Sequence, residues 1–370
     1  MAQLAFEYVS RSFGSTDALV GLNLAIESGE FFALIGSSGC GKSTALRIAA
    51  GLETPDHGEV VCDGEVITRV PTRKRGFGMV TQQNALVGAR SARGNIALPL
   101  ELERTHREEI SVRVDDDAER LAISHLLDRR RDELSGGEVQ AVQLTRAMIA
   151  RPRVLLLDEP LARIDLDLRT KLRMDLARIQ RDDGSTTLLV TADQEDAMVL
   201  ADRIAVLHDG HLQQVGPPIQ LHDRPVNVTV ATFLGDPPMS IIPAHVVDDG
   251  GLRFYLIGGQ RFPAHPPVAA RFAGGRALVG IRPYDIRVER RVDDDAIAAH
   301  VEQSEFRGSS TVLTTTLDQM RDPLRGGPLC LRITCAGAGP RAGATVGLHL
   351  DGARFHLFDP YTGAALAHPL

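Results

Sequence analysis

The sequence predicts an α/β domain built on a largely parallel sheet, followed by a small β-barrel domain. In the first two thirds of the chain, short apolar runs alternate with segments of helical periodicity, which is the pattern of strands joined by helical crossovers. After Pro237 and Pro238 the helical segments are absent from the pattern. Short apolar runs rich in β-branched residues are separated there by Gly, Pro and Asp turns, as in small all-β domains. The length of 370 residues also predicts two domains, because a single core rarely grows that large.

The first domain is predicted to span residues 1–236. Its apolar runs predict strands at Glu30–Ile35, Val154–Leu157 and Thr187–Val190. Apolar residues at i, i+3 and i+4 predict helices over Leu46–Gly51, Glu108–Ile123, Val139–Ala150 and Leu168–Arg181. A mostly helical insert is expected at about 88–150, and a last helical turn at Thr229–Gly235.

The second domain is predicted to span residues 237–370. Six short runs in it have the length and composition of strands, and the Gly- and Pro-rich segments between them are expected to be loops. These runs are Ile241–Val247, Ala277–Ile281, Leu313–Leu317, Leu329–Thr334, Thr345–Leu350 and Arg354–Phe358.

Composition narrows the classes of function. A formal charge of −7 disfavours a nucleic-acid binder, because contacts to phosphate backbones need a surplus of Lys and Arg. There is no run of about 18 apolar residues and no basic, apolar leader, so we expect neither a membrane span nor secretion. The four cysteines form no CxxC pair and fit small buried residues in a reducing cytosol better than disulfides or a zinc site.

A phosphate-binding loop is the strongest motif in the chain. Residues 36–44 fit G-x-x-x-x-G-K-[ST] and lie between a predicted strand and a helix start. Glycines let backbone N–H groups point at nucleotide phosphates, and the helix N-terminus adds a favourable dipole. Lys42 would neutralise the phosphates and Ser43 would ligate Mg²⁺, whereas the alternative is a glycine-rich turn without a ligand. The loop consists of Gly36, Ser37, Ser38, Gly39, Cys40, Gly41, Lys42, Ser43 and Thr44.

Two carboxylates stand at the end of a predicted buried strand. Asp158 and Glu159 follow an apolar run, and the topology of a parallel sheet is expected to bring them beside the phosphate loop. Asp158 could hold Mg²⁺ through water, and Glu159 could accept the proton of an attacking water. The alternative is an acidic pair that opens a loop before Pro160.

A second anion site is predicted at Ser135, Gly136 and Gly137, directly before a helical segment. A serine and two glycines at a helix start suit an anion, although a simple helix N-cap has the same composition. One compact chain cannot enclose one phosphate group with two distant helix ends. We therefore expect two copies to share each ATP, with this helix of one copy closing on ATP held by the other.

With these motifs in this order, the sequence resembles the ATP-binding subunits of ABC transporters, in particular those of sugar importers of the maltose, trehalose or glycerol-phosphate type. The resemblance covers almost the whole chain and implies a RecA-like P-loop NTPase core with a helical subdomain, followed by an OB-like regulatory β-domain. Phe233–Met239, Val279–Pro283 and Leu357–Pro360 resemble landmarks of that β-domain. A packing or dimer-forming module without regulation is the alternative.

The resemblance also implies roles for single residues. Phe13 would stack on adenine, although a core Phe is the alternative. Gln82 would sense Mg²⁺ and the attacking water, and would thus belong to both the catalytic and the metal site, although it could equally be an exposed loop amide. Asp165 would link the two nucleotide sites across the dimer, and an N-cap for the following helix explains it nearly as well.

The partners implied by the resemblance are a second ATP-binding subunit, expected as a homodimer, and two transmembrane permease subunits. An extracytoplasmic solute-binding protein would take part indirectly, and no nucleic acid is expected. The cofactors would be ATP and Mg²⁺. The chain would lie peripherally on the cytoplasmic face of the plasma membrane.

Three departures from the family pattern bear on activity and contacts. Ala192 stands where the family has a His that contacts the γ-phosphate, and loss of one such donor costs about 10²- to 10³-fold in rate. Ala141 stands where relatives have Arg, which weakens the expected support for the closed dimer. The segment 85–90 lacks the aromatic and Pro-His character of the family's permease-facing surface.

Two functional hypotheses follow. The first is a working transport ATPase, which the retained Lys42, Asp158 and Glu159 favour. The second is a nucleotide-binding regulatory clamp that closes on ATP but hydrolyses little, which Ala192 and Ala141 permit. Soluble ABC proteins of DNA repair or translation usually carry coiled-coil inserts or tandem cassettes, and the sequence has neither.

Overall fold

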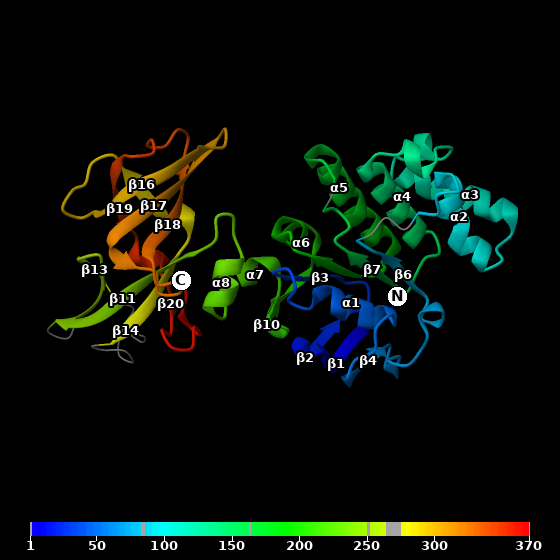
Figure 1. The fold of residues 1–370 in the computed structure, drawn as a ribbon, viewed down its shortest axis with the longest axis horizontal. Helices are drawn as coiled ribbons and strands as arrows, with labels where there is room; N and C mark the ends of the chain where they lie inside the picture. Colours follow the sequence, from blue (N-terminus) through cyan, green and yellow to red (C-terminus); the bar gives the residue numbers. More distant parts are fainter. Residues whose placement is uncertain (1, 83–85, 163, 250–251, 264–274, 370) are drawn as a thin grey trace. The chain divides into compact units, whose positions relative to one another are not determined.

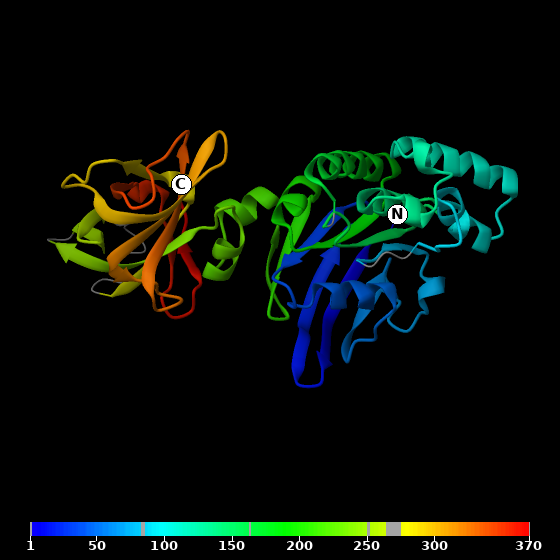
Figure 2. The ribbon, with the colours of Figure 1, turned by 45° about the horizontal axis from the view of Figure 1, so that its top comes forward.

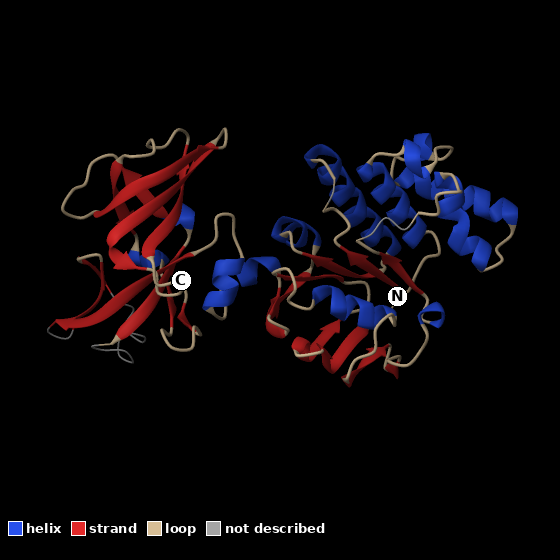
Figure 3. Cartoon of the chain, in the orientation of Figure 1, coloured by secondary structure: helices blue, strands red, loops and turns tan. Residues whose placement is uncertain are grey.

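The computed structural model describes residues 2–82, 86–162, 164–249, 252–263 and 275–369. The chain divides into two compact units, residues 1–218 and residues 219–370. Figure 1 follows the chain from blue to red, and Figure 3 shows that most of the helices belong to the first unit and that strands dominate the second.

A six-stranded sheet forms the centre of the first unit. Its order is β10-β9-β3-β8-β7-β6, and all neighbours are parallel except β9 and β10. Every residue of β3, β7 and β8 is buried, as expected for parallel strands covered on both faces, and the three strands predicted from apolar runs are confirmed. The strands are β3 (Phe31–Gly36), β6 (Phe77–Val80), β7 (Val154–Asp158), β8 (Thr186–Thr191), β9 (Arg203–His208) and β10 (His211–Gly216).

Helices cover both faces of this sheet. One face carries α1 (Lys42–Ala50), and the other carries α4 (Gly136–Met148) and α5 (Leu166–Asp183), as Figures 1 and 2 show. The first unit also contains α2 (Ala92–Leu102), α3 (Arg107–Arg120) and α6 (Gln194–Leu200). The four predicted helices are confirmed, but α1 begins four residues before the predicted Leu46 because the phosphate loop runs directly into it.

An antiparallel sheet completes the first unit, and the sequence analysis predicts none of its strands. Its order is β2-β1-β4-β5, and one apolar cluster joins it to α1 and the parallel sheet through residues such as Leu4, Leu22, Leu46 and Leu156. Its strands are partly exposed and broken by register shifts, so their apolar residues form no continuous run. They are β1 (Leu4–Phe13), β2 (Thr16–Ile26), β4 (His57–Cys62) and β5 (Glu65–Val66).

The second unit consists mainly of two antiparallel sheets with a common core. Their orders are β13-β12-β11-β14-β20-β21 and β15-β19-β16-β17-β18, and residues of both sheets, such as Val279, Leu313 and Val346, share one apolar cluster. This is the expected OB-like β-domain. Its strands are β11 (Ser240–Asp249), β12 (Leu252–Ile257), β13 (Gln260–Pro263), β14 (Arg276–Ile281), β15 (Ile286–Glu289), β16 (Ile297–Phe306), β17 (Ser310–Arg321), β18 (Pro328–Ala336), β19 (Thr345–Leu350), β20 (His356–Phe358) and β21 (Ala365–Ala367).

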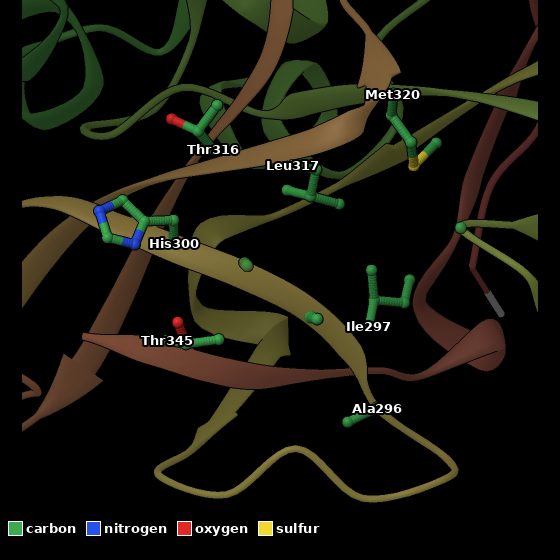
Figure 4. Close-up of a pocket in the computed structure, with 10 residues that line it drawn as sticks. Ala296, Ile297, His300, Thr316, Leu317, Met320 and Thr345 are labelled. Carbon is green, nitrogen blue, oxygen red and sulfur yellow. The ribbon is translucent and has the colours of Figure 1, made fainter. Parts of the chain in front are cut away.

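The strand predicted at Arg354–Phe358 is shorter than expected, because residues 352–354 form a 3₁₀ turn. The strands β16 and β17 diverge beyond the pair His300 and Thr316, and leave a cavity of about 380 Å³ between them. Figure 4 shows Ile297, Leu317 and other side chains that line this cavity.

Two short helices, α7 (Pro218–Asp223) and α8 (Val228–Phe233), group with the second unit. Val228 and Ala231 of α8 pack against Ile241 and Phe358 in an apolar cluster. The compact second unit thus begins earlier than residue 237, where the second domain is predicted to begin. The predicted domain limits follow the family pattern and stay a prediction.

Cysteine burial differs in part from expectation. Cys40 and Cys62 are buried, but Cys330 is exposed because it points outward from β18, where buried and exposed residues alternate. Within the described parts of the chain, no helix is both long enough and apolar enough to cross a bilayer.

A buried arginine fastens the C-terminus of α1. Arg75 is 4% exposed, and its guanidinium donates to the main-chain oxygens of Ile48 (3.0 Å), Ala49 (2.6 Å), Thr68 (3.0 Å) and Val70 (2.9 Å). The last carbonyl groups of a helix have no partner within the helix. Ile48 O also accepts from the Gly51 N–H at 3.1 Å, whereas Arg75 is the described donor to Ala49 O.

We expect Arg75→Met to lower the free energy of unfolding of the first unit by about 2–4 kcal/mol, because it leaves several buried carbonyl groups unpaired. Urea unfolding of the whole chain measures the loss. Arg73→Met is the matched control, since Arg73 is exposed on the neighbouring 3₁₀ turn, and it should change stability by less than about 0.5 kcal/mol. Equal losses in the two variants would contradict the assignment.

A second prediction concerns pH. His356 is 4% exposed, and burial, reinforced by the charges of Arg282 and His368, lowers its pKa to about 3. The unfolded chain takes up this proton near the ordinary value of about 6.5. The stability contribution is therefore complete above that pH and is lost as the pH falls towards 3. Unfolding of the second unit should become easier between these values, and His356→Gln should flatten the dependence, whereas the exposed His211→Gln should leave it unchanged.

Candidate functional site

The loop between β3 and α1 closes tightly on itself. Gly41 has a φ of +105°, and a Cβ atom there would lie 2.0 Å from the main-chain oxygen of Ala18, so only glycine fits. Lys42 Nζ donates to the main-chain oxygens of Gly36 and Ser37, each at 2.8 Å. The lysine therefore lies across the loop with its charge fixed among loop carbonyl groups.

The outer part of this loop is open to solvent. Ser37, Ser38, Gly39 and Ser43 are exposed, Thr44 is half-buried, and Gly36, Cys40, Gly41 and Lys42 are buried. Main-chain N–H groups at the exposed positions can thus reach a phosphate without any change in the packing of α1. The buried lysine ends among the loop's own atoms, which is compatible with a phosphate loop, and phosphate binding at these residues stays a prediction.

The parallel pairing of strands brings Asp158 to this loop. β7 pairs with β8 and β8 with β3, so the carboxyl ends of all three strands lie at one edge of the sheet. Ser43 Oγ donates to Asp158 Oδ1 at 3.0 Å. The pKa of the Asp158 carboxyl is raised overall, because the effect of burial exceeds the lowering by the Ser43 hydroxyl and by the charge of Lys42. A hydroxyl and a carboxylate at one helix start are hard oxygen ligands and fit Mg²⁺.

Glu159 is held by the end of β8. It has a φ of +51°, a left-handed conformation that is strained for a residue with a side chain. Its main-chain N–H donates to Val190 O at 2.8 Å, and its Oε1 accepts from the main-chain N–H of Ala192 at 2.9 Å. Burial raises the pKa of the Glu159 carboxyl, and the Ala192 N–H and Lys42 lower it. A carboxylate of raised pKa in a fixed position suits a general base.

At residue 192 the side chain and the main chain differ in what they offer Glu159 and the nucleotide. The exposed methyl group of Ala192 offers no donor, as the sequence indicates, but the main chain of the same residue makes a contact with Glu159 that sequence reasoning could not supply. His208, the nearest downstream histidine, is exposed and lies 3.6 Å from Asp209, as expected of a surface residue.

Of the three family-implied residues, Phe13 and Asp165 have other contacts in the structure, and Gln82 is exposed. Phe13 is 47% exposed at the end of β1, with the Arg11 guanidinium 4.8 Å from its ring centre, so it is not a core residue. Asp165 is the N-cap of α5, and its Oδ1 accepts from the Leu168 N–H at 3.0 Å. Gln82 is exposed two residues after β6. The adenine, dimer and metal roles of these residues stay predictions.

Ser135 begins α4 with a reciprocal cap. Its Oγ accepts from the Glu138 N–H at 3.3 Å, and its own N–H donates to Glu138 Oε2 at 2.7 Å. Gly137 is packed closely, since a Cβ atom there would lie 2.5 Å from Leu168 Cδ2 and would displace that side chain, whereas Gly136 is exposed. Because α4 and α1 lie on opposite faces of the sheet, the fold does not place the helix of Ser135 beside the phosphate loop of the same chain (Figure 1, Figure 2).

Ala141 lies one turn further along α4 and is 2% exposed. Together with Ser135, Glu138 and Leu168 it lines a cavity of about 230 Å³ between α4 and α5. The short side chain therefore leaves a space beside the Ser135 cap that a longer side chain would occupy.

Sequence reasoning missed an ion-pair network between α5 and α6. Arg169 and Arg173 of α5 bind Asp193, Glu195 and Asp196 at the start of α6. The available signal was two arginines four residues apart on one helix and an acidic cluster at the start of the next. Neither feature is specific without the fold that brings the two helices together.

These features define an ATP-binding cassette of the P-loop class. Residues 19–162 match the family model described as ABC transporter, and residues 279–358 match the model described as TOBE domain. Among solved structures, a dimeric ATP-binding cassette in a post-hydrolysis state with ADP and Pi is similar, with a TM-score of 0.54 and 29% identity, and the match covers 58% of this chain and 98% of that one.

Curated relatives match over the full length. The trehalose/maltose import ATP-binding protein of Thermococcus litoralis is 38% identical over 379 residues, which cover 99% of this chain and 100% of the relative. The sn-glycerol-3-phosphate import ATP-binding protein of Rhizobium johnstonii is 35% identical over 371 residues, which cover 100% of this chain and 98% of the relative. The chain belongs to the ABC transporter family, as one of its ATP-binding subunits, and is an ABC-type ATPase. The family predicted from the motifs is confirmed.

The missing donor at residue 192 gives a direct prediction. Ala192→His should raise the rate of Mg·ATP hydrolysis by about tenfold or more, because it restores a positioned donor at the γ-phosphate. Ala192→Leu is the control for side-chain size and should give no rise. An unchanged rate in Ala192→His, with the protein folded and ATP bound, would show that the missing side-chain donor at residue 192 does not limit hydrolysis.

Proposed function

We propose that this chain is the ATP-binding subunit of an importer for a sugar or polyol, and that two copies close on two molecules of Mg·ATP to drive it. The observation that carries the proposal is the separation of two helix starts, those of α1 and α4, on opposite faces of one sheet (Figure 1), and we propose that both bind the nucleotide's phosphates. A second copy is needed for both to meet one nucleotide. The full-length relatives, which include import subunits for trehalose/maltose and glycerol-3-phosphate, support the solute class.

The roles of the site residues follow from their chemistry. Lys42 and the loop N–H groups hold the β- and γ-phosphates, while Ser135 of the other copy caps the γ-phosphate. Ser43, Asp158 and Gln82 hold Mg²⁺, which offsets phosphate charge as the bond to the leaving group breaks. Glu159 accepts the proton of the attacking water.

Slow hydrolysis is the second candidate behaviour, and Ala192 favours it. The side chain cannot donate to the γ-phosphate, yet the main chain keeps Glu159 in place. We propose a slow but working ATPase, in which closure of the two copies does the mechanical work and hydrolysis resets them. A regulatory clamp without turnover is the alternative that the rate measurement on Ala192→His addresses.

The loop after Gln82 is the proposed permease contact. Asn95 is 1% exposed, and its side chain accepts from the Val87 N–H at 2.7 Å and donates to the main-chain oxygens of Val87, Arg90 and Ser91. This buried amide fixes the described part of the loop, whereas Ala85 lies outside the described residues. We propose that the two permease subunits dock on this loop, one on each of the two copies. The chain then lies peripherally on the cytoplasmic face of the membrane, and a solute-binding protein supplies the solute outside.

Mixing two inactive variants tests the shared site. Lys42→Ala removes the charge that holds phosphate, and Ser135→Asp keeps the helix cap while repelling the other copy's phosphate. Each variant alone should be inactive. In a random mixture, half of the pairs are mixed and keep one intact site of two, so about a quarter of the wild-type rate should return.

The control for this experiment is each variant mixed with more of itself, which should stay inactive. Both variants must unfold at the wild-type temperature, so that loss of activity reflects the site. No recovery in the mixture, at concentrations where the copies associate, would show that the two residues do not act across a pair.

A further inference from the structure

We propose that Arg169 is a positioning residue for hydrolysis, which acts through Asp193 to keep the main-chain N–H of Ala192 on Glu159. The inference rests on the proposed role of Glu159 as the base. It concerns the turn that follows β8, residues 191–193, which we call the switch turn.

The switch turn is the point where Glu159 is held by a neighbouring strand. The Ala192 N–H donates to Glu159 Oε1 at 2.9 Å, and the Glu159 N–H donates to Val190 O at 2.8 Å. Because the side chain at 192 is a methyl group, the main-chain N–H is the polar group that this residue offers the base. Its direction depends on the conformation of the turn and not on a rotamer.

The conformation of the turn depends on Asp193. The Asp193 N–H donates to Thr191 Oγ1 at 3.0 Å. Its carboxylate accepts from the N–H groups of Glu195 (2.8 Å) and Asp196 (3.3 Å), and so caps α6. A single carboxylate therefore ties the switch turn to the start of the next helix.

Arg169 holds this carboxylate from α5. Its Nη2 lies 2.5 Å from Asp193 Oδ2 and 2.6 Å from Asp196 Oδ2, and its Nε donates to Asp196 Oδ1 at 3.1 Å. The side chain of Arg169 is 18% exposed, that of Asp196 is 3% exposed and that of Asp193 is 34% exposed, so the contact with Asp196 is largely shielded from water and the contact with Asp193 is partly shielded. A planar guanidinium in this fork geometry fixes direction as well as distance.

Arg169 also links the switch turn to the start of α5. It lies one turn after Asp165, which caps the helix, and its main-chain N–H donates to Asp165 O at 2.9 Å. Movement of the α5 start would therefore reach Glu159 through three polar contacts. In the proposed pair of copies, Asp165 is the residue expected at the seam.

Arg173 provides a matched control within the same interface. It lies one turn further along α5, is 7% exposed, and binds Asp196 at 2.7 Å and Glu195 at 3.1 Å. Its described contacts reach α6 but not the switch turn. Removal of Arg173 breaks an ion pair of similar burial between the same two helices.

The experiment compares Arg169→Met with Arg173→Met in the full-length chain. Both should lower the unfolding temperature. Arg169→Met should also lower kcat for Mg·ATP by about tenfold to a hundredfold while KM and the affinity for ATP stay within about twofold, because a displaced base costs rate and not binding. Arg173→Met should keep kcat within about twofold. Arg169→Lys, which keeps the charge and loses the fork, should recover part of the rate.

Ala192→Pro tests the N–H directly, since proline has no donor there, and Ala192→Gly keeps the donor as the matched change. Ala192→Pro should lower kcat about as much as Arg169→Met. The double variant should lose little more than either single one, because both changes remove one contact.

Three results would overturn the inference. Equal kcat losses in Arg169→Met and Arg173→Met, a fully additive double variant, or a loss confined to ATP affinity would each leave Arg169 a stability residue. Lys42→Ala provides the baseline. If the unaltered chain is no faster than Lys42→Ala, the proposed function fails as well, whereas an active chain with equal arginine variants defeats only the positioning role.

Discussion

The side-by-side pairing of β3, β8 and β7 is the constraint on which the site depends. These buried parallel strands all end at one edge of the sheet, and each is followed there by part of the site: the phosphate loop, the switch turn and Glu159. Parallel register places the ends of distant segments together without contacts between their side chains. The contacts of Ser43 with Asp158 and of Ala192 with Glu159 are consequences of this register.

Close packing then fixes the conformation of the phosphate loop at this edge. Gly41 lies so near the main chain of Ala18 that the loop has one path into α1, and Lys42 is fixed by carbonyl oxygens of the loop itself. Arg75 joins the other end of α1, through the main-chain oxygens of Ile48 and Ala49, to the main-chain oxygens of Thr68 and Val70. The phosphate loop is thus held by sterics where it enters α1, and a buried cation holds the far end of that helix.

The opposite face of the sheet carries a different set of parts. α4 begins with the capped Ser135, α5 begins with the capped Asp165, and Arg169 connects α5 to the switch turn. A movement of α5 at this face can therefore displace Glu159 at the edge of the sheet. This arrangement suits a protein in which the approach of a second copy must be coupled to the chemistry of a bound nucleotide.

The sequence by itself determined the chemistry that local patterns encode. Residues 36–44, Asp158 with Glu159, and Ser135 with its glycines were recognisable because each motif needs only neighbouring residues and a flanking strand or helix. The buried strands were recognisable because they are continuously apolar. Tertiary structure alone decided the antiparallel sheet of β1, β2 and β4, whose partly exposed strands leave no continuous apolar run, and the early start of the second unit at α7. It alone revealed that Ala192 holds Glu159 through its main chain and that Arg169 holds Asp193, because these contacts join residues whose spacing in the sequence carries no periodic signal and whose meeting depends on how strands and helices pack.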